Sequence, residues 1–238
     1  MTAPLDLARL LADRLNPERE AAVARHLEAC RTPFTRHRFE TEEGRGETFA
    51  VDVGAGDRLL PHLAPRVPPG LRVRLLFTAC EERDFLGARE YVRERGVAGI
   101  AGVLSLELCG IGDSLVVWDA GEESALTRVV RRAFDSLGLV NDEGYHVVGR
   151  IPRFGSDHRA FAAAGVPAYG LTVIPRANAD TLRRFIWRPR WGALRFLLRR
   201  PAPFDTYHTS GDGLATLEPR ALTLTARALE AVIEALGR

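Results

Sequence analysis

The chain has 238 residues, of which 46% are hydrophobic and 27% charged, so it can bury the core of one ordinary domain. Its net charge of +2 argues against nucleic-acid binding, which needs clustered basic charge. All 33 basic residues are arginine, which excludes a lysine-based mechanism. Cys30, Cys80 and Cys109 have no paired spacing, which argues against a disulfide framework or a thiolate zinc site.

Two helices are predicted at the N-terminus. Residues 1–15 are amphipathic and lack the continuous apolar core of a signal peptide. Residues 17–29 form the second helix, with Asn16 as its cap and Pro17 at its first position. No stretch is long and apolar enough to cross a membrane. We therefore expect a cytoplasmic protein with no transmembrane segment.

Strands and helices alternate along the rest of the chain. Strands are predicted at residues 34–40, 48–53, 71–78, 101–108, 115–119 and 168–173, and helices at 57–64, 85–96, 124–137 and 218–236. This alternation predicts an α/β fold, with a mostly parallel (mixed) central sheet flanked by helices. No linker interrupts it, so we expect one domain over residues 1–238.

An insertion at about residues 176–203 is rich in Arg, Trp and Pro. It carries an apolar stripe but is too short and too charged to span a membrane. It could be a pocket wall, a contact between copies of the chain, or a helix lying on lipid. We favour the first two interpretations, because exposed aromatic clusters usually mark partners. The contact between copies would make a homo-oligomer through residues 183–200.

Two adjacent acids, Glu81 and Glu82, follow the apolar strand at residues 71–78. Open α/β sheets bind ligands outside the carboxyl ends of their strands, so both side chains can face one cleft. One acid could hold a metal while the other accepts a proton. The alternative is a solvated loop whose acids favour a helix N-terminus.

Three further places offer groups suited to a metal site. Glu107 ends the strand at residues 101–108, Asp157 and His158 precede a helix, and His208 lies in a turn of small polar residues. Carboxylates and neutral imidazole are ligands that zinc accepts when thiolates are absent. Each element alone is weak, since a lone His is more often structural and a strand-end acid is often a helix cap.

The elements together resemble the zinc aminopeptidase family. Their order is Glu-Glu after an apolar strand, Leu-Glu-Leu-Cys-Gly at a strand end, Gly-Ser-Asp-His, and then Tyr-His-Thr-x-x-Asp. The flanking residues 86–91 and 163–168 match as well, and the resemblance covers residues 73–238. The superfamily includes the bacterial leucyl aminopeptidases, glutamate carboxypeptidase II and glutaminyl cyclase. The resemblance implies a zinc-exopeptidase-like (phosphorylase/hydrolase-like) fold.

The resemblance also implies roles for the acids. Glu81 looks like the general base that deprotonates a metal-bridging water, and Glu82 looks like a zinc ligand together with His208. Glu107 looks like a ligand of the other zinc. Asp157 looks like the acid of the Ser-Asp-His motif, close to the metals without binding them directly.

The remaining implied roles concern the substrate. His158 follows Asp157 in the Ser-Asp-His motif, and Tyr207 would stabilise the tetrahedral oxyanion by a hydrogen bond. The implied cofactor is zinc, as one or two ions. The implied substrate is a peptide with a free N-terminus, whose first side chain occupies an apolar pocket.

The sequence departs from the family pattern upstream of these motifs. The family's His-x-Asp and Gly-Ala-x-Asp-Asn are not recognisable, and the chain is shortened near residues 53–68. We favour a register in which both ligands are absent, because Asp57 is followed by Arg58 and a short helix. In the other register Asp57 bridges the metals, and His62 or Asp52 replaces the missing His. Without a bridge, the remaining donors would hold at most one zinc well.

Three functions follow as hypotheses. The leading one is zinc-dependent aminopeptidase hydrolysis. The first alternative is an inactive pseudopeptidase that serves as a binding or oligomerisation module. The second alternative is a glutaminyl-peptide cyclotransferase, which is less favoured because that branch usually has Trp where Tyr207 stands.

Overall fold

The computed structural model describes residues 8–9, 11–12, 15–54, 66–151, 154–187 and 200–237. The strands are β1 (Thr35–Thr41), β2 (Gly44–Gly54), β3 (Arg72–Phe77), β4 (Val103–Leu106), β5 (Ser114–Trp118), β6 (Tyr145–Val147) and β7 (Ala168–Ile174). The helices are α2 (Asn16–Ala29), α3 (Leu86–Arg95), α4 (Ala125–Ser136), α5 (His158–Ala163), α6 (Ala179–Trp187) and α8 (Pro219–Ala235), with short 3₁₀ turns at Arg176–Asn178 and Leu214–Thr216.

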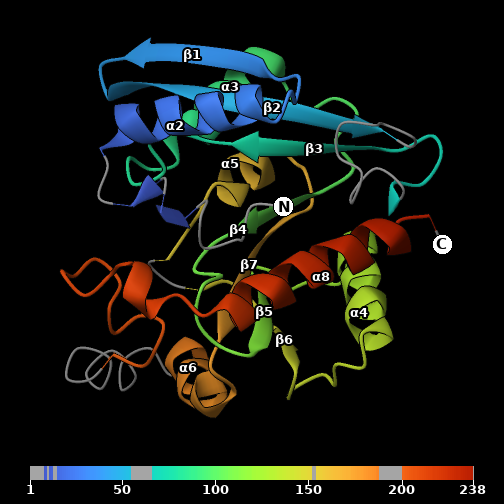
Figure 1. The fold of residues 1–238 in the computed structure, drawn as a ribbon. Helices are drawn as coiled ribbons and strands as arrows, with labels where there is room; N and C mark the ends of the chain where they lie inside the picture. The colour runs from blue at the N-terminus through green and yellow to red at the C-terminus, as the bar shows by residue number, and fades with distance from the viewer. Residues whose placement is uncertain are drawn as a thin grey trace.

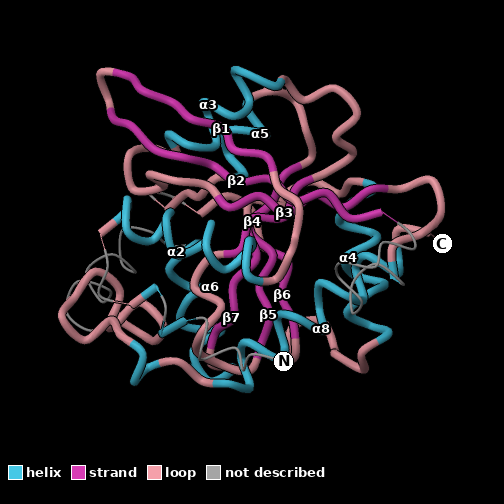
Figure 2. Tube along the Cα trace, turned by 45° about the horizontal axis from the view of Figure 1, so that its top comes forward, coloured by secondary structure: helices cyan, strands magenta, loops and turns pink. Residues whose placement is uncertain are grey.

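The strands form two groups that confirm the mixed α/β class. One group has the order β1-β2-β3 and the other the order β4-β7-β5-β6. In Figures 1 and 2, β4 lies between β3 and β7, where the two groups meet. Among the described strands, three of the five pairings are antiparallel, so the parallel share is smaller than the sequence suggested. The alternation of strands and helices predicts the fold class but does not predict the direction of each strand. A two-residue turn at residues 42–43 joins β1 to β2, and so short a connection requires the two strands to be antiparallel.

Helices cover both faces of the sheet, as expected. Figure 1 shows α2 in front of β2 and β3 with α3 behind, and α8 crossing in front of β5 and β7 beside α4. Alternate residues of β5 explain the arrangement, because successive strand side chains point to opposite faces. Leu115 and Val117 pack in the cluster that includes α4 and α8. Val116 and Trp118 pack on the other face, against Ala179 of α6.

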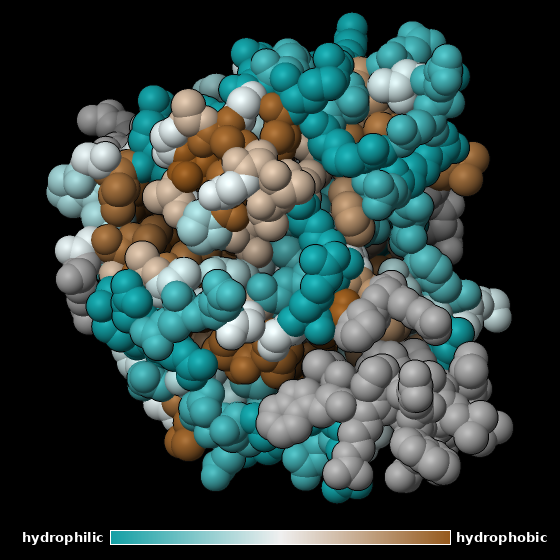
Figure 3. Space-filling model, turned by 180° about the vertical axis from the view of Figure 1, so that it is seen from behind, coloured by the Kyte–Doolittle hydropathy of each residue, from teal (hydrophilic) through white to brown (hydrophobic). Residues whose placement is uncertain are grey.

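The surface seen from behind is mainly hydrophilic, with hydrophobic residues in separate patches (Figure 3). Among the described helices, none combines the length and apolar character needed to cross a membrane. The segment at 183–200, where we expected a contact between copies, is described only at residues 183–187 and 200. That contact therefore stays a prediction.

Several helix and strand boundaries in the structure differ from those predicted from the sequence. The α2 helix begins at Asn16 with Leu15 as its N-cap, because the Glu18 carboxylate accepts a hydrogen bond from the Leu15 N–H at 3.2 Å. The β2 strand begins at residue 44 rather than 48, since the β1–β2 turn is tighter than expected. The sequence did not predict β6 or α6. The predicted helix at 57–64, with Asp57 and His62, and most of the helix at 1–15 lie outside the described residues.

Candidate active site

A tight turn between β3 and α3 presents Glu81 and Glu82. It is closed by the Gly87 N–H, which donates to the Ala79 carbonyl at 3.0 Å. A Cβ at Gly87 would lie only 2.3 Å from that carbonyl oxygen, so the approach requires glycine. Cys80 adopts a left-handed backbone with φ of +54°. Because the strand ends before this turn, the side chains of Glu81 and Glu82 need not point to opposite faces of the sheet.

Glu107 lies at the end of the neighbouring strand β4. Its N–H donates to the Leu171 carbonyl at 3.0 Å, which extends the β4–β7 pairing by one residue. The next residue, Leu108, has φ of +51° and turns the chain away. The Ser156 hydroxyl donates to Glu107 Oε2 at 3.3 Å and contacts the Ser105 hydroxyl at 3.0 Å. Glu107 is thus fixed by two elements that are distant in sequence.

Asp157 lies at the start of α5 and links it to the end of β3. The Thr78 hydroxyl donates to Asp157 Oδ2. Asp157 Oδ1 is buried and has no hydrogen-bond partner among the described residues. A buried oxygen without a partner is costly, and it is most simply explained by a group that binds there.

Asp119, which the sequence analysis did not single out, anchors the α5 end of the site. Its carboxylate contacts His158 Nε2 at 3.1 Å and accepts from Arg159 Nε at 2.7 Å and from the Ile151 N–H at 3.0 Å. His158 is fully buried and meets the Trp118 ring edge to face at 4.7 Å. Burial opposes ionisation of Asp119, but hydrogen bonds from His158, Arg159 and Ile151 outweigh it and lower its pKa to about 2.

The Asp119→Asn variant is expected to lower the free energy of unfolding by about 2 kcal/mol at pH 7. The folded pKa lies below the ordinary value of 3.8, so ionised Asp119 stabilises the fold above about pH 4. This contribution is lost as the pH falls toward 2, and the two proteins should then converge. Urea denaturation at pH 7, 4 and 2.5 measures the difference, with the exposed Asp84→Asn as the control. A deficit of the same size at every pH would contradict this account.

Glu82 and His208 meet at the open side of the site. His208 Nε2 lies 2.9 Å from Glu82 Oε1, with both side chains more than half exposed. The Tyr207 ring stacks on the His208 ring at a centroid distance of 4.0 Å, and His208 has φ of +58°. An exposed ion pair contributes little to stability, so this pair is accessible to a ligand at little energetic cost.

The carboxylates repel one another. Burial, with repulsion from Glu107, Glu82 and Asp157, raises the pKa of Glu81 to about 8. Burial also raises the pKa of Glu107 and that of Asp157. Burial and the nearby acids raise the pKa of Tyr207, which keeps its phenol protonated and able to donate. The site has an excess of negative charge that a cation would relieve.

The donor chemistry fits a divalent metal ion. Among the described residues, no three His, Cys, Asp or Glu side chains are grouped as a complete ligand set. The groups present are nevertheless carboxylates and an imidazole, which zinc accepts. The unpartnered Asp157 Oδ1 and the raised pKa values of the acids both point to missing positive charge. Glu82 and His208 are in contact, and no third candidate donor is grouped with them among the described residues.

The upstream candidate ligands add no available metal donor among the described residues. Asp52 on β2 accepts two hydrogen bonds from Arg74 of β3, at 2.6 and 2.8 Å. The Arg74 hydrogen bonds, helped by its charge, lower the pKa of Asp52 despite partial burial. Asp52 is therefore committed to an ion pair. Asp57 and His62 lie outside the described residues.

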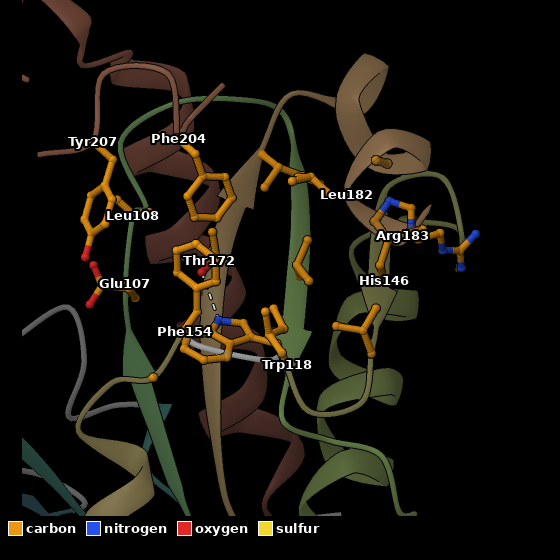
Figure 4. Close-up of a pocket in the computed structure, with 16 residues that line it drawn as sticks. Glu107, Leu108, Trp118, His146, Phe154, Thr172, Leu182, Arg183, Phe204 and Tyr207 are labelled. Atoms are coloured by element: carbon orange, nitrogen blue, oxygen red, sulfur yellow. Dashed lines mark hydrogen bonds between the residues drawn. The ribbon is translucent and has the colours of Figure 1, made fainter. Parts of the chain in front are cut away.

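An apolar pocket opens beside the acids. The empty space within it, which includes the open mouth, is about 770 Å³. Figure 4 shows Glu107 and Tyr207 at one side, with the Tyr207 hydroxyl directed toward the Glu107 carboxylate. Phe154, Phe204 and Trp118 lie in the middle of the pocket. The indole of Trp118 lies against Gly170, where a Cβ would be 2.1 Å from the ring.

The arrangement matches a known family. The profile of peptidase family M28 matches residues 58–233. The chain belongs to peptidase family M28. This match confirms the family that the motif order indicated, although its upstream ligand segment is not recognisable in this M28 chain.

Solved structures share the fold of this M28 chain. The zinc aminopeptidase BSAP from Bacillus subtilis aligns with a TM-score of 0.58 and 15% identity, over 81% of this chain and 50% of that one. The LapA aminopeptidase from Legionella pneumophila aligns with 0.64 and 13%, over 97% and 69%. The glutaminyl cyclase of an Acidobacteriales bacterium aligns with 0.61 and 16%, over 97% and 92%. No match was found among curated proteins.

The M28 chain therefore spans about half the length of the Bacillus subtilis enzyme. Its predicted site residues come from two strand ends, the start of α5 and the loop before α8. The structure brings the acids together with Tyr207 and His208. Sequence reasoning missed the roles of Asp119 and Ser156 and most of the pocket walls. Ser156 lies within the Gly-Ser-Asp-His motif, and Asp119 is a carboxylate directly after an apolar strand, so both had a detectable signal.

Proposed function

We propose that this M28 chain removes amino-terminal residues from peptides with the aid of one zinc ion. The observation that carries the proposal is the position of Glu81. Its carboxylate interacts with Glu107, Glu82 and Asp157, and Glu107 and Tyr207 line an apolar pocket. A proton acceptor, metal donors, a phenol and a side-chain pocket thus occupy one edge of the sheet.

Glu82 and His208 would hold the ion, with Glu107 as a third donor. When bound, zinc supplies a Lewis acid that polarises the substrate carbonyl. The carboxylates Glu107 and Asp157 also suit a positively charged amino group, because opposite charges orient a substrate as it binds. This preference favours a peptide with a free N-terminus.

Glu81 moves the proton. A carboxyl with a pKa near neutrality can accept a proton from the attacking water and return it to the leaving amine. The Tyr207 hydroxyl stays protonated, so it can donate a hydrogen bond to the oxyanion. The apolar walls exclude water from the first side chain, which strengthens these polar contacts.

The test is hydrolysis of leucyl p-nitroanilide by protein that has been freed of metal and then titrated with zinc. We expect activity to rise and saturate near one zinc per chain, and to be lost on adding a chelator. An absence of zinc-dependent hydrolysis for every aminoacyl p-nitroanilide would overturn the proposal. It would favour the alternative of an inactive binding module.

Glutaminyl-peptide cyclisation is a second candidate because of one observation. The chain spans 92% of the length of the Acidobacteriales glutaminyl cyclase, compared with half of the Bacillus subtilis aminopeptidase. The same Glu81 could take a proton from the substrate's own amine, which then attacks the side-chain amide and releases ammonia. Ammonia released from an amino-terminal glutaminyl peptide would support this activity. Its absence, with hydrolysis present, would leave the peptidase.

Three further expectations stay predictions. These are the single-domain extent over residues 1–238, the cytoplasmic location, and the homo-oligomer through residues 183–200. Size measurement in solution would test the last of them directly.

A further inference from the structure

One row of side chains crosses the sheet from the catalytic end of the pocket to its far end. Val116 of β5 pairs with Thr172 of β7 on one side and with His146 of β6 on the other. Glu107 continues the row, because its N–H bonds to Leu171 next to Thr172. Three strand spacings separate Glu107 from His146, which is about 14 Å. A long substrate side chain fits along this row.

The far end of the row is polar. Figure 4 shows His146 and Arg183 on the side of the pocket opposite Glu107 and Tyr207. His146 is 2% exposed, and neither of its ring nitrogens has a hydrogen-bond partner among the described residues. Leaving such a buried group unpaired is energetically unfavourable. A buried imidazole that lines an apolar pocket without a partner indicates that a ligand supplies one.

The charges around His146 favour its neutral form. Burial lowers the pKa of His146, Asp180 opposes this effect and Arg176 adds to it. Asp142 lies 3.9 Å from Nδ1, too far for a hydrogen bond, and it is engaged by the Arg183 guanidinium. A neutral imidazole has one N–H donor and one acceptor nitrogen. The complementary group is therefore a neutral one that can both donate and accept.

We propose that His146 makes this pocket selective for an amino-terminal tyrosine, whose phenol hydroxyl bonds to the imidazole. The inference rests on the proposed function, since it assigns the first side chain of the peptide to this pocket. Tyrosine has a large apolar body for the walls formed by Trp118 and Phe154, and a polar tip that donates and accepts. A cationic tip would meet Arg183, and an anionic tip would meet a guanidinium already paired with Asp142 and an imidazole that is neutral.

The experiment measures binding without catalysis. Titration calorimetry gives the dissociation constants of tyrosinamide and phenylalaninamide, which differ only in the hydroxyl, for zinc-loaded protein that has His146 intact and carries Glu81→Gln so that the amides are not hydrolysed. We expect tyrosinamide to bind about tenfold more tightly, the value of one neutral hydrogen bond. The His146→Leu variant should abolish this ratio. The His146→Gln variant, which keeps a donor and an acceptor, should retain much of it.

The outcomes distinguish a failure of the tyrosine preference from a failure of the proposed peptidase function. Equal affinities in the protein with His146 intact, or a ratio that His146→Leu leaves unchanged, would overturn the tyrosine preference. Tighter binding of glutamic acid amide would overturn it in favour of an anionic tip. The midpoint of thermal unfolding of each variant shows whether it is folded, and the His146→Gln ratio keeps the test valid if His146→Leu unfolds. Loss of zinc-dependent hydrolysis with an intact ratio would instead reject the peptidase function.

Discussion

The Glu81→Gln variant is expected to lower kcat/KM for leucyl p-nitroanilide by about 10³-fold, the usual size of a general-base contribution. Glutamine has nearly the same shape but cannot accept the proton. Burial, together with the acids around Glu81, also raises its pKa to about 8 in the protein without metal, so it is largely protonated at pH 7. Because the substitution removes a group that is largely uncharged there, folding should change little.

The matched control is Glu122→Gln, which makes the same chemical change at an exposed turn after β5. Rates are measured at saturating zinc, and zinc content is determined for each protein so that metal loss is not mistaken for loss of the base. If Glu81→Gln hydrolyses the substrate as fast as the control, Glu81 is not the base. If neither protein exceeds the uncatalysed rate, the chain is an inactive member of its family.

The His208→Ala variant is expected to weaken zinc binding by at least about 100-fold, since even indirect supports of metal ligands contribute 10- to 100-fold. His208 is the only imidazole that contacts a predicted carboxylate ligand among the described residues. Without His208 only carboxylate donors remain, and carboxylates suit magnesium or calcium better than zinc. Competition with a fluorescent zinc chelator measures the affinity.

The matched control for this experiment is His26→Ala on α2, where the imidazole contacts the Cys30 thiol across one helical turn. His208 belongs to an exposed pair of small energetic value, so both variants should unfold near the wild-type temperature. Zinc affinity that is equal in both variants would remove His208 from the site and leave the carboxylates as the only donors.

Left-handed backbone occurs at several residues around the candidate site. Cys80, Leu108, Asp119 and His208 all have φ values between +51° and +62°. Each such residue costs about 1–3 kcal/mol, and strain of this kind persists where surrounding contacts enforce it. The Gly87–Ala79 contact and the Asp119 hydrogen bonds provide that enforcement. Arg31 and Asp142 adopt the same backbone region elsewhere in the chain, so the strain accompanies the candidate site without identifying it.

The sequence predicted the family better than the fold's details. Glu81, Glu82 and Glu107 were selected as candidate site residues because carboxylates that end apolar strands meet at one edge of an α/β sheet. The order of the motifs then gave the family. Boundaries shifted by a few residues, and β6 was missed because it is only three residues long. The antiparallel pairing of β5 with β7 was missed because strand direction depends on connections that local patterns do not record.

The sequence by itself determined the α/β class and the family, and it selected the candidate acids, because local hydrophobic patterns and ordered motifs are written along the chain. Only the tertiary structure decided what surrounds those acids. The burial and repulsion that raise the pKa of Glu81, the anchoring of α5 by Asp119 and the buried position of His146 all depend on distances between residues far apart in sequence. Burial and electrostatic interaction depend on how the chain packs in three dimensions, so they cannot be read from the order of its residues.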